Sequence, residues 1–470
     1  MFDLIQFGSQ PCLEGDGQAY TYAEVQRETE RMRAVLPGRH LVLCLCENSL
    51  PSLLGYISLV VHDQVPLLIE ASLQAPTVQA MAALYRPGYV WLAEARSAEW
   101  PGATPVYRSG HYVLLKLAHA EAPPLLDASL QLLLTTSGST GSSKLVRLSR
   151  ANLLANAASI CTYLDIRAED VAVTSLPFSY SFGLSIIHTH LLAGASIQVT
   201  ALTPLNRQFW DLMQQRKVTS LSGVPYTYDM LKRIKFERFD LPALRYLTQA
   251  GGKMSASGLT YLQRLSTEKA WPCIVMYGQT EAGPRMAYLP AAWLAHKPQS
   301  IGDAIPGGRF ELIDVDGKLI TAPHVPGELV YYGPNVALGY ATGAADLVRG
   351  DDWGGRLSTG DVAYRDEEGC YYISGRLKRF VKVFGNRVSF DEVEALLQSA
   401  HPDCDFVCHG QDDRLCIAFV GACDVQALLA FVTRQLGLHR SAIHCEAITE
   451  IPRLGNGKID YTALYSSTSL

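Results

Sequence analysis

Helix-like and strand-like segments alternate along most of this chain, and this alternation restricts the fold more than any other feature. Residues 22–35 have the spacing of an amphipathic helix, whereas residues 40–45 and 131–135 are short apolar runs of strand length. Such alternation is typical of α/β proteins, in which helices cover the faces of a sheet. The sequence therefore predicts α/β layers through the first three quarters of the chain.

A change of sequence character predicts a second, smaller domain. Residues 375–387, GRLKRFVKVFGNR, are rich in glycine and basic residues, and a helix candidate at 390–398 and short strand candidates between 405 and 420 follow. A single core stops growing near about 250–300 residues, so a chain of 470 residues has room for more than one. We expect a large N-terminal α/β domain at residues 1–376 and a small α+β domain at 377–470.

Charge and hydropathy exclude two classes of partner. The net charge of -5 and the pI near 6.2 provide no concentrated basic face for nucleic acid or an anionic membrane. The apolar run from Leu53 to Val61 is shorter than the roughly 18 residues that a membrane span needs, and the chain does not start like a secretion signal. We expect a soluble, unexported protein with no nucleic-acid or membrane partner.

The cysteines predict a reducing compartment. There are 11 of them, an odd number, spread from Cys12 to Cys445 without a C-x-x-C pair, in a chain too large to depend on disulfides. Those after residue 403 lack the paired spacing of metal ligands, and free cysteines commonly pack as small apolar side chains. We therefore expect a cytoplasmic protein without disulfides and without a cysteine metal site.

A loop of small polar residues follows the strand candidate at 132–134. It reads TTSGSTGSSK, residues 135–144, and its glycines Gly138 and Gly141 allow successive N–H groups to converge on an anion, to which Lys144 adds charge. A flexible linker is the alternative, but linkers rarely stand between a buried strand and an amphipathic segment. The common P-loop is excluded, because it needs four residues between its glycines and only two occur here.

This loop resembles the phosphate-loop signature of the ANL superfamily, which comprises acyl-CoA synthetases, nonribosomal-peptide adenylation domains and luciferases. Further segments similar to that superfamily's motifs follow in the same order as far as Lys458. The resemblance implies a large N-terminal domain of several subdomains, a mobile C-terminal domain, and an enzyme that joins a carboxylic acid to AMP. In the loop it implies nucleotide binding by Thr136, Ser137, Gly138, Ser139, Thr140 and Lys144.

Residues 276–283, MYGQTEAG, resemble the superfamily's adenine and metal motif. In this role Tyr277, next to Gly278, offers an aromatic face to adenine, Thr280 a hydroxyl to the α-phosphate, and Glu281 a carboxylate to Mg²⁺. The alternative is a strand followed by a turn with an exposed acid. Because a phosphate-loop resemblance precedes this segment in the chain, we favour the role in adenine and metal binding.

Two shorter segments complete the nucleotide site that the resemblance implies. Residues 249–253, QAGGK, are similar to a glycine-rich element, in which Gly251 and Gly252 let a ligand approach the backbone, although an ordinary turn explains them almost as well. Residues 357–361, LSTGD, match a motif whose aspartate, here Asp361, accepts hydrogen bonds from both ribose hydroxyls.

The segment GRLK at 375–378 resembles the superfamily's hinge motif. The resemblance assigns Arg376 to the nucleotide and Lys378 to the pivot between domains, whereas a basic surface turn is the commoner meaning of such a segment alone. Lys382 and Gly385 fall where the small domain of the superfamily approaches the acceptor in the second half-reaction.

Residues 451–460, IPRLGNGKID, are similar to the superfamily's C-terminal motif. Its lysine, here Lys458, contacts the carboxylate and the α-phosphate and offsets the charge of two anionic reactants that otherwise repel each other. A two-residue hairpin turn at Asn456 and Gly457 that carries an exposed Lys458 is compatible with this role.

The acyl pocket is less well defined by the sequence. Residues 176–184, LPFSYSFGL, resemble a segment of acyl- and aryl-CoA ligases, with Tyr180 in place of a histidine. Ser181 stands where amino-acid adenylating relatives have an aspartate, and a neutral serine cannot compensate a buried ammonium group. We therefore expect an acid without an α-amino group. Further predicted pocket residues are Ser222, Gly223 and Pro284.

The resemblance implies ATP and Mg²⁺ as cofactors, and CoA or the phosphopantetheine of a separate carrier protein as acceptor. Two alternatives stay open. One is an adenylating enzyme with an amine or oxygen acceptor, and the other is a non-catalytic nucleotide-binding homologue, for which Ser143 and Leu145 depart from the Pro and Gly often found there. Neither the acid nor the oligomeric state follows from the sequence.

Overall fold

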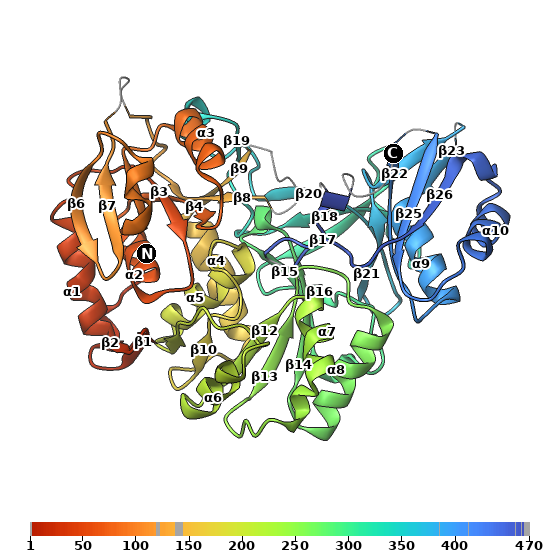
Figure 1. Ribbon diagram of the computed structural model, residues 1–470, viewed down its shortest axis with the longest axis horizontal. Helices are drawn as coiled ribbons and strands as arrows, with labels where there is room; N and C mark the ends of the chain where they lie inside the picture. The colour runs from red at the N-terminus through yellow and green to blue at the C-terminus, as the bar shows by residue number, and fades with distance from the viewer. Residues whose placement is uncertain are drawn as a thin grey trace. The chain divides into compact units, whose positions relative to one another are not determined.

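The computed structural model describes residues 2–118, 123–136, 144–384, 386–411, 413–455, 457–461 and 463–464, with Asn386 and Arg387 described in the backbone only. The chain forms two compact units. The first unit comprises Met1–Gln299, Ala304–Arg309 and Tyr332–Leu357, and the second comprises Ser300–Asp303, Phe310–Tyr331 and Ser358–Leu470. Both units mix helices and strands, which confirms the predicted α/β class (Figure 1).

An eight-stranded sheet forms one half of the first unit (Figure 1). In β3, whose sequence is LVLCLC, the odd-numbered residues pack with α3 (Ala75–Tyr85) and the even-numbered residues pack with α2 (Leu50–Val61), as the two-residue period of a strand dictates. Both faces of the sheet are therefore covered by helices. The strand order is β19 (Gly339–Ala341), β9 (Leu145–Ser149), β8 (Leu130–Thr135), β4 (Val65–Glu70), β3 (Leu41–Cys46), β5 (Tyr89–Ala93), β7 (Tyr112–Lys116) and β6 (Thr104–Ser109).

A second sheet of the first unit has a helical pair on each face. In its strand β14, Ile274 and Met276 pack with α5, whereas Cys273 and Val275 pack with α7 and α8. Because the core cluster of α5 also includes α2 and β3, α5 lies between the two sheets. The strands are β12 (Ser220–Gly223), β13 (Tyr246–Gln249), β14 (Cys273–Gly278), β15 (Arg285–Leu289) and β16 (Asp303–Ala304), and the helices are α4 (Arg150–Leu164), α5 (Ser181–Ala193), α7 (Pro225–Ile234) and α8 (Ala256–Glu268).

Smaller elements complete the first unit. Helix α1 (Tyr22–Arg33) begins with a capping box in which the Thr21 hydroxyl accepts from the Glu24 N–H and the Glu24 carboxylate accepts from the Thr21 N–H. A four-stranded sheet combines two strands next to α1 in sequence with two strands between residues 171 and 198, and α6 (Arg207–Gln215) follows the last of these along the chain. The sheet order is β10 (Val171–Val173), β11 (Ser196–Gln198), β1 (Pro11–Gly15) and β2 (Gln18–Thr21).

The second unit carries the predicted small α+β region. The predicted helix at 390–398 is α9 (Phe390–Ala400), and the predicted strands at 405–408 and 415–420 are parts of β24 (Asp405–Gln411) and β25 (Arg414–Val420). The other elements are β17 (Arg309–Ile313), β18 (Gly327–Tyr332), β20 (Arg356–Arg365) and β21 (Tyr371–Arg376) in one sheet, the β22 (Phe380–Val383) and β23 (Asn386–Ser389) pair, β26 (Ile443–Ala447) and α10 (Val425–Leu436). The predicted domain boundary after residue 376 is the place where the C-terminal domain is expected to turn, and it stays a prediction.

One expectation about the cysteines is wrong. Cys404 and Cys423 form a disulfide, which ties the start of β24 to the loop before α10. The other nine cysteines are free and, apart from the half-buried Cys161, buried, as small core residues are.

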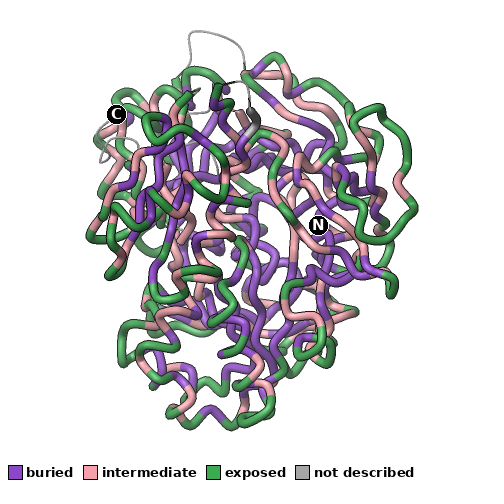
Figure 2. The backbone as a smooth tube through the Cα atoms, turned by 90° about the vertical axis from the view of Figure 1, so that its right-hand side faces the viewer, coloured by how far each residue is buried: buried purple, intermediate pink, exposed green. Residues whose placement is uncertain are grey.

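Burial follows the layers. Figure 2 shows buried residues concentrated along the inner parts of the chain and exposed residues along its outer parts. Among the helices that the structure describes, none has the length and apolar composition needed to cross a bilayer. The described residues also contain no group of three or more histidine, cysteine, aspartate or glutamate side chains that could hold a metal ion.

Candidate active site

The two ends of the predicted phosphate loop lie next to each other. Thr135 at the end of β8 pairs with Leu145 at the start of β9 in an antiparallel register, so Thr136 and Lys144 flank the loop. The Lys144 ammonium lies 3.2 Å from the centroid of the Tyr340 ring on β19. The predicted ligands between these ends, Ser137, Gly138, Ser139 and Thr140, lie outside the described residues.

Tyr340 also orients the predicted metal ligand. Its hydroxyl donates to Glu281 Oε1 at 2.8 Å, and burial, assisted by the Glu281 charge, raises the pKa of Tyr340, so the phenol stays a donor. Within the described residues, the other carboxylate oxygen of Glu281 accepts no hydrogen bond. A hard oxygen ligand with one fixed and one open oxygen fits Mg²⁺, which proteins often hold by one or two carboxylates together with substrate phosphates.

Removing the Tyr340 hydroxyl should weaken Mg²⁺ binding by Glu281 and leave the aromatic ring beside Lys144 in place. We expect Tyr340→Phe to lower kcat/KM for ATP by about 10-fold and to raise the Mg²⁺ concentration needed for half-maximal rate, as loss of a metal ligand's hydrogen-bond partner does. Tyr340→Leu, which also removes the ring, should cost more. Steady-state rates across a Mg²⁺ titration test this, and equal losses in both variants would contradict a separate role for the hydroxyl.

A buried arginine fixes the strand that carries Tyr340. Arg147 on β9 is 0% exposed and forms an ion pair with Asp352. Its guanidinium donates to the backbone carbonyls of Tyr340 at 3.1 Å, Gly350 at 3.1 Å and Leu338 at 3.3 Å. The side chain thus joins β9, β19 and the segment after β19.

Breaking that junction should destabilise the first unit. We expect Arg147→Met to lower the free energy of unfolding by about 3–5 kcal/mol, because it removes the donor of several buried carbonyls and leaves Asp352 with only the exposed Arg349 as its ion-pair partner. Arg207→Met, at an exposed position, is the control. Chemical denaturation followed by circular dichroism measures both, and a change below about 1 kcal/mol for Arg147→Met would refute the structural role.

The structure brings the glycine-rich element QAGGK against the predicted acyl segment. Gly251 has φ +87°, and a Cβ at this position would lie 2.6 Å from the Tyr180 hydroxyl. A Cβ at Gly252 would lie 3.3 Å from Pro225. Only glycine fits at residue 251 beside Tyr180, whereas the predicted approach of a ligand to this backbone stays a prediction.

The adenine and metal motif contacts the start of α5 through Thr280. Strand β14 ends with Tyr277 and Gly278, and a Cβ at Gly278 would lie 1.9 Å from the Pro284 carbonyl oxygen, so this turn is tightly closed. The Thr280 Oγ1 and Ser181 Oγ atoms lie 3.1 Å apart, and both residues are buried. A predicted phosphate ligand and a predicted acyl-pocket residue are thus hydrogen-bonded.

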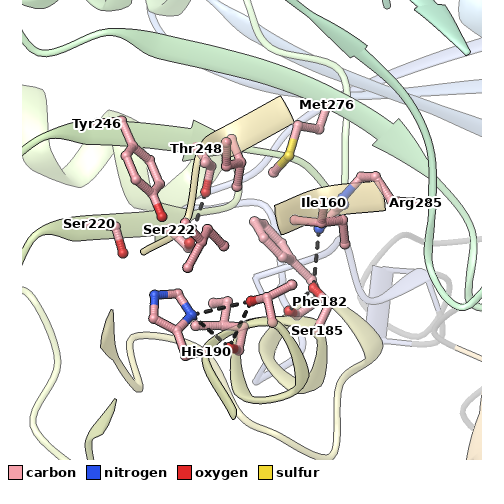
Figure 3. Close-up of a pocket in the computed structure, with 14 residues that line it drawn as sticks. Ile160, Phe182, Ser185, His190, Ser220, Ser222, Tyr246, Thr248, Met276 and Arg285 are labelled. Atoms are coloured by element: carbon pink, nitrogen blue, oxygen red, sulfur yellow. Dashed lines mark hydrogen bonds between the residues drawn. The ribbon is translucent and has the colours of Figure 1, made fainter. Parts of the chain in front are cut away.

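A small pocket lies along α5, where Phe182, Ser185 and His190 line it (Figure 3). Ser222, a predicted pocket residue, lines it and lies 2.8 Å from Thr248 through their hydroxyl oxygens. Gly223 instead serves the turn into α7, since a Cβ there would lie 2.8 Å from Thr227. The remaining polar lining includes Ser185, Thr189, His190, Ser220, Tyr246 and Arg285.

In the second unit, the structure pairs two of the predicted nucleotide ligands. Arg376 Nε donates to Asp361 Oδ1 at 2.9 Å, across the register pair that β20 and β21 form, so the two predicted nucleotide ligands are ion-paired. Lys378 is exposed after β21, and Lys382 is exposed on β22. Gly385 lies outside the described residues.

Lys458 lies on a turn, as expected, but the turn is longer than predicted. The Leu454 N–H donates to the Lys458 carbonyl at 2.8 Å, which leaves three residues between them instead of two. Gly457 has φ +79°, the left-handed conformation that such three-residue loops use. Lys458 itself is half-buried.

Two residues of the site were not predicted from the sequence. Tyr340 lies about sixty residues beyond the motif that it supports, and only the pairing of β19 with β9 brings it there. Arg285 offered a signal, because it is a charged residue that opens the apolar segment RMAYL directly after the motif.

Comparison with known proteins identifies the family of this chain. A family model described as "AMP-binding enzyme" matches residues 5–341. A medium-chain fatty-acid–CoA ligase of Escherichia coli (strain K12) is 27% identical over 344 residues, which cover 70% of this chain and 60% of that enzyme. The chain spans between half and two thirds of the length of this relative and of two other curated relatives, for which the shares are 52% and 58%.

Solved structures are similar along nearly the whole chain. The o-succinylbenzoate CoA synthetase of Bacillus subtilis, in complex with an acyl-adenylate intermediate, is 20% identical with a TM-score of 0.76, and the match covers 97% of this chain and 96% of that one. The amide bond synthetase McbA of Marinactinospora thermotolerans is 20% identical with a TM-score of 0.77 and coverages of 99% and 98%. These likenesses confirm the expected fold of a large N-terminal and a smaller C-terminal domain.

Because the family model covers well over half of its length, the chain belongs to the family of AMP-binding enzymes, and the resemblance to the ANL superfamily is confirmed.

Proposed function

We propose that this chain uses ATP to convert a small carboxylic acid to acyl-AMP, releases pyrophosphate, and transfers the acyl group to a thiol of CoA or of a carrier protein's phosphopantetheine. The observation that carries the proposal is the Lys144, Tyr340 and Glu281 group. It combines a cation at the end of the phosphate loop with a carboxylate held by one oxygen. That combination suits a nucleoside triphosphate bound together with Mg²⁺.

The first half-reaction needs charge neutralisation and alignment. Lys144 and the loop it closes hold the phosphates, Thr280 donates to the α-phosphate, and Lys458 offsets the charge of the attacking carboxylate. Glu281 holds Mg²⁺, which when bound neutralises phosphate charge and stabilises the leaving pyrophosphate. Tyr277, Gly251 and Gly252 bind adenine, and Asp361 and Arg376 bind the ribose and phosphate.

The second half-reaction uses a movement of the C-terminal domain. We infer that residues 377–470 turn about Lys378, which withdraws Lys458 and brings the face of Lys382 and Gly385 to the acyl-adenylate. One site then serves two reactions in sequence. A free carrier protein and a cytoplasmic location are part of this proposal.

An amine acceptor is the second candidate, and the likeness to the fold of an amide bond synthetase favours keeping it. The two are separated by product analysis after adenylation, with CoA, a phosphopantetheinylated carrier protein and simple amines supplied in turn. We expect a thioester by mass spectrometry. An amide formed in preference to any thioester would replace the thiol in the proposal, and no turnover with any acid would favour the non-catalytic reading.

A further inference from the structure

Asp391 contacts the chain on both sides of the proposed pivot. It lies in the first turn of α9, and its Oδ2 atom accepts a hydrogen bond from the Arg376 N–H at 3.0 Å. Its Oδ1 atom forms an ion pair with Arg379, the residue after Lys378. One carboxylate thus joins residues before and after Lys378, and all of these residues belong to the second unit.

The residues before the pivot are held by strand β20. Arg376 is the register partner of Asp361, and the Leu377 N–H donates to the Gly360 carbonyl at 2.8 Å. These contacts involve no residue beyond Lys378. A turn of the C-terminal domain about Lys378 can therefore leave them in place, because a hinge absorbs its movement in a few backbone angles.

The residue after the pivot is held by the C-terminal domain. Two nitrogens of the Arg379 guanidinium donate to the Glu394 carboxylate at 2.7 and 2.5 Å, and one of them also donates to the Cys408 carbonyl at 3.3 Å. The centroid of the Tyr461 ring is 5.5 Å from the guanidinium carbon. Because Tyr461 follows Lys458 by three residues, Arg379 links the pivot to the segment that carries the proposed catalytic lysine.

Asp391 is not needed to neutralise Arg379, because Glu394 already pairs with this guanidinium in the bidentate geometry of a strong ion pair. The three side chains are between 18% and 24% exposed, so their charges are only partly screened. Burial raises the pKa of Glu394, and the charge of Asp391 acts in the same direction. What Asp391 adds to the pair, at the cost of this repulsion, is the hydrogen bond to the Arg376 N–H across Lys378.

We propose that Asp391 is a positioning residue that holds the hinge in one of its two conformations. Its hydrogen bond from the Arg376 N–H, which we call the hinge latch, breaks each time the C-terminal domain turns about Lys378. The inference rests on the proposed two-step function and assigns a control residue to its domain movement. A contact made in one conformation only shifts the populations of both. Asp391 therefore sets the balance between the two half-reactions.

The test measures the two half-reactions separately. Acyl-adenylate formation is followed by ATP–pyrophosphate exchange with the best acid of a panel, and acyl transfer is followed from the synthetic acyl-adenylate to CoA or another acceptor that the unaltered protein uses. In Asp391→Ala we expect the half-reaction that the latched conformation serves to slow, and the ratio of the two rates to change by about 10-fold. Asp391→Asn keeps an oxygen that can accept from the Arg376 N–H and should change the ratio by about 3-fold only.

The matched control is Glu392→Ala, which removes an exposed carboxylate from the same turn of α9 and should leave the ratio unchanged. Asp391→Ala should keep its melting temperature within about 3 °C, because Glu394 still pairs with Arg379. Equal losses in both half-reactions together with a lower melting temperature show that Asp391 only supports the fold. That result overturns the proposal, and so does an unchanged ratio in active protein.

Trypsin provides a readout that does not depend on activity. The protease cleaves after arginine and lysine, which Arg376, Lys378 and Arg379 supply at the hinge, and cleavage of a folded chain follows the population in which the segment opens. We expect the initial rate of cleavage within residues 376–379, identified by mass spectrometry of the fragments, to rise about 10-fold in Asp391→Ala and to stay unchanged in Glu392→Ala.

The protease result separates the hinge latch from the function on which it rests. Faster cleavage of Asp391→Ala, in a protein that forms acyl-adenylate with no acid, supports the latch while the adenylating function fails. Unchanged cleavage overturns the latch, whether or not the protein is active.

Discussion

Replacing Lys458 with alanine is expected to lower carboxylate-dependent ATP–pyrophosphate exchange by about 100- to 1000-fold, which is typical for the loss of one group that stabilises charge in a transition state. The side chain lies next to the turn that Leu454 and Gly457 close, so truncation should not disturb the backbone. The melting temperature should therefore stay within the error of the measurement. The expected loss is in kcat, because the contact forms with the reacting atoms.

The same variant should retain the second half-reaction. If the C-terminal domain withdraws Lys458 before transfer, the variant supplied with synthetic acyl-adenylate and CoA should form thioester within about 3-fold of the normal rate. Lys318→Ala, at an exposed turn of the same unit, is the matched control and should leave both steps unchanged. Equal loss of both half-reactions would contradict a role for Lys458 in adenylation alone.

Glu281→Gln is expected to lower the exchange rate by about 100-fold or more, because the substitution keeps the shape of the side chain and removes the charge that holds Mg²⁺. The Tyr340 hydroxyl, which donates to Glu281 Oε1 at 2.8 Å, can donate to the amide oxygen as well, so the local structure should persist. The variant should require more Mg²⁺ for half-maximal rate. A Mg²⁺ titration of the exchange rate provides the measurement.

The control for this charge is Glu268→Gln at the exposed end of α8, where neither rate nor Mg²⁺ requirement should change. If Glu281→Gln instead lowered the melting temperature and left the Mg²⁺ dependence unaltered, the carboxylate would have a structural role. Tyr340→Phe removes the hydroxyl that supports Glu281, and Glu281→Gln removes the proposed metal ligand itself, so the two variants form a series.

The layers of the fold follow from local sequence patterns. The uninterrupted apolar run LVLCLC gives a strand buried on both faces, and the predicted helix and strands after residue 389 appear as α9, β24 and β25. The pairing of Cys404 with Cys423 was missed, because cysteine spacing alone does not reveal which side chains a fold brings together.

The sequence predicted the motifs of the candidate site but not the residues from distant segments that contact them. Residues within one motif share a loop or strand end, so the resemblance to the superfamily's motifs could name Thr280, Glu281 and Gly251 as candidates. Tyr340 acts on Glu281 from a distant strand. Long-range contacts of this kind depend on tertiary packing, which no local pattern encodes.

The most direct test of the central claim is to detect acyl-adenylate itself. The purified chain is incubated with ATP, Mg²⁺ and panels of aryl, short-chain, fatty, hydroxy, dicarboxylic and amino acids, without an acceptor, and ATP–pyrophosphate exchange is followed with mass spectrometry of the products. The account predicts acid-dependent exchange and an acyl-AMP of matching mass. Folded protein that binds ATP but forms acyl-AMP with no acid would contradict it and indicate a non-catalytic nucleotide-binding protein.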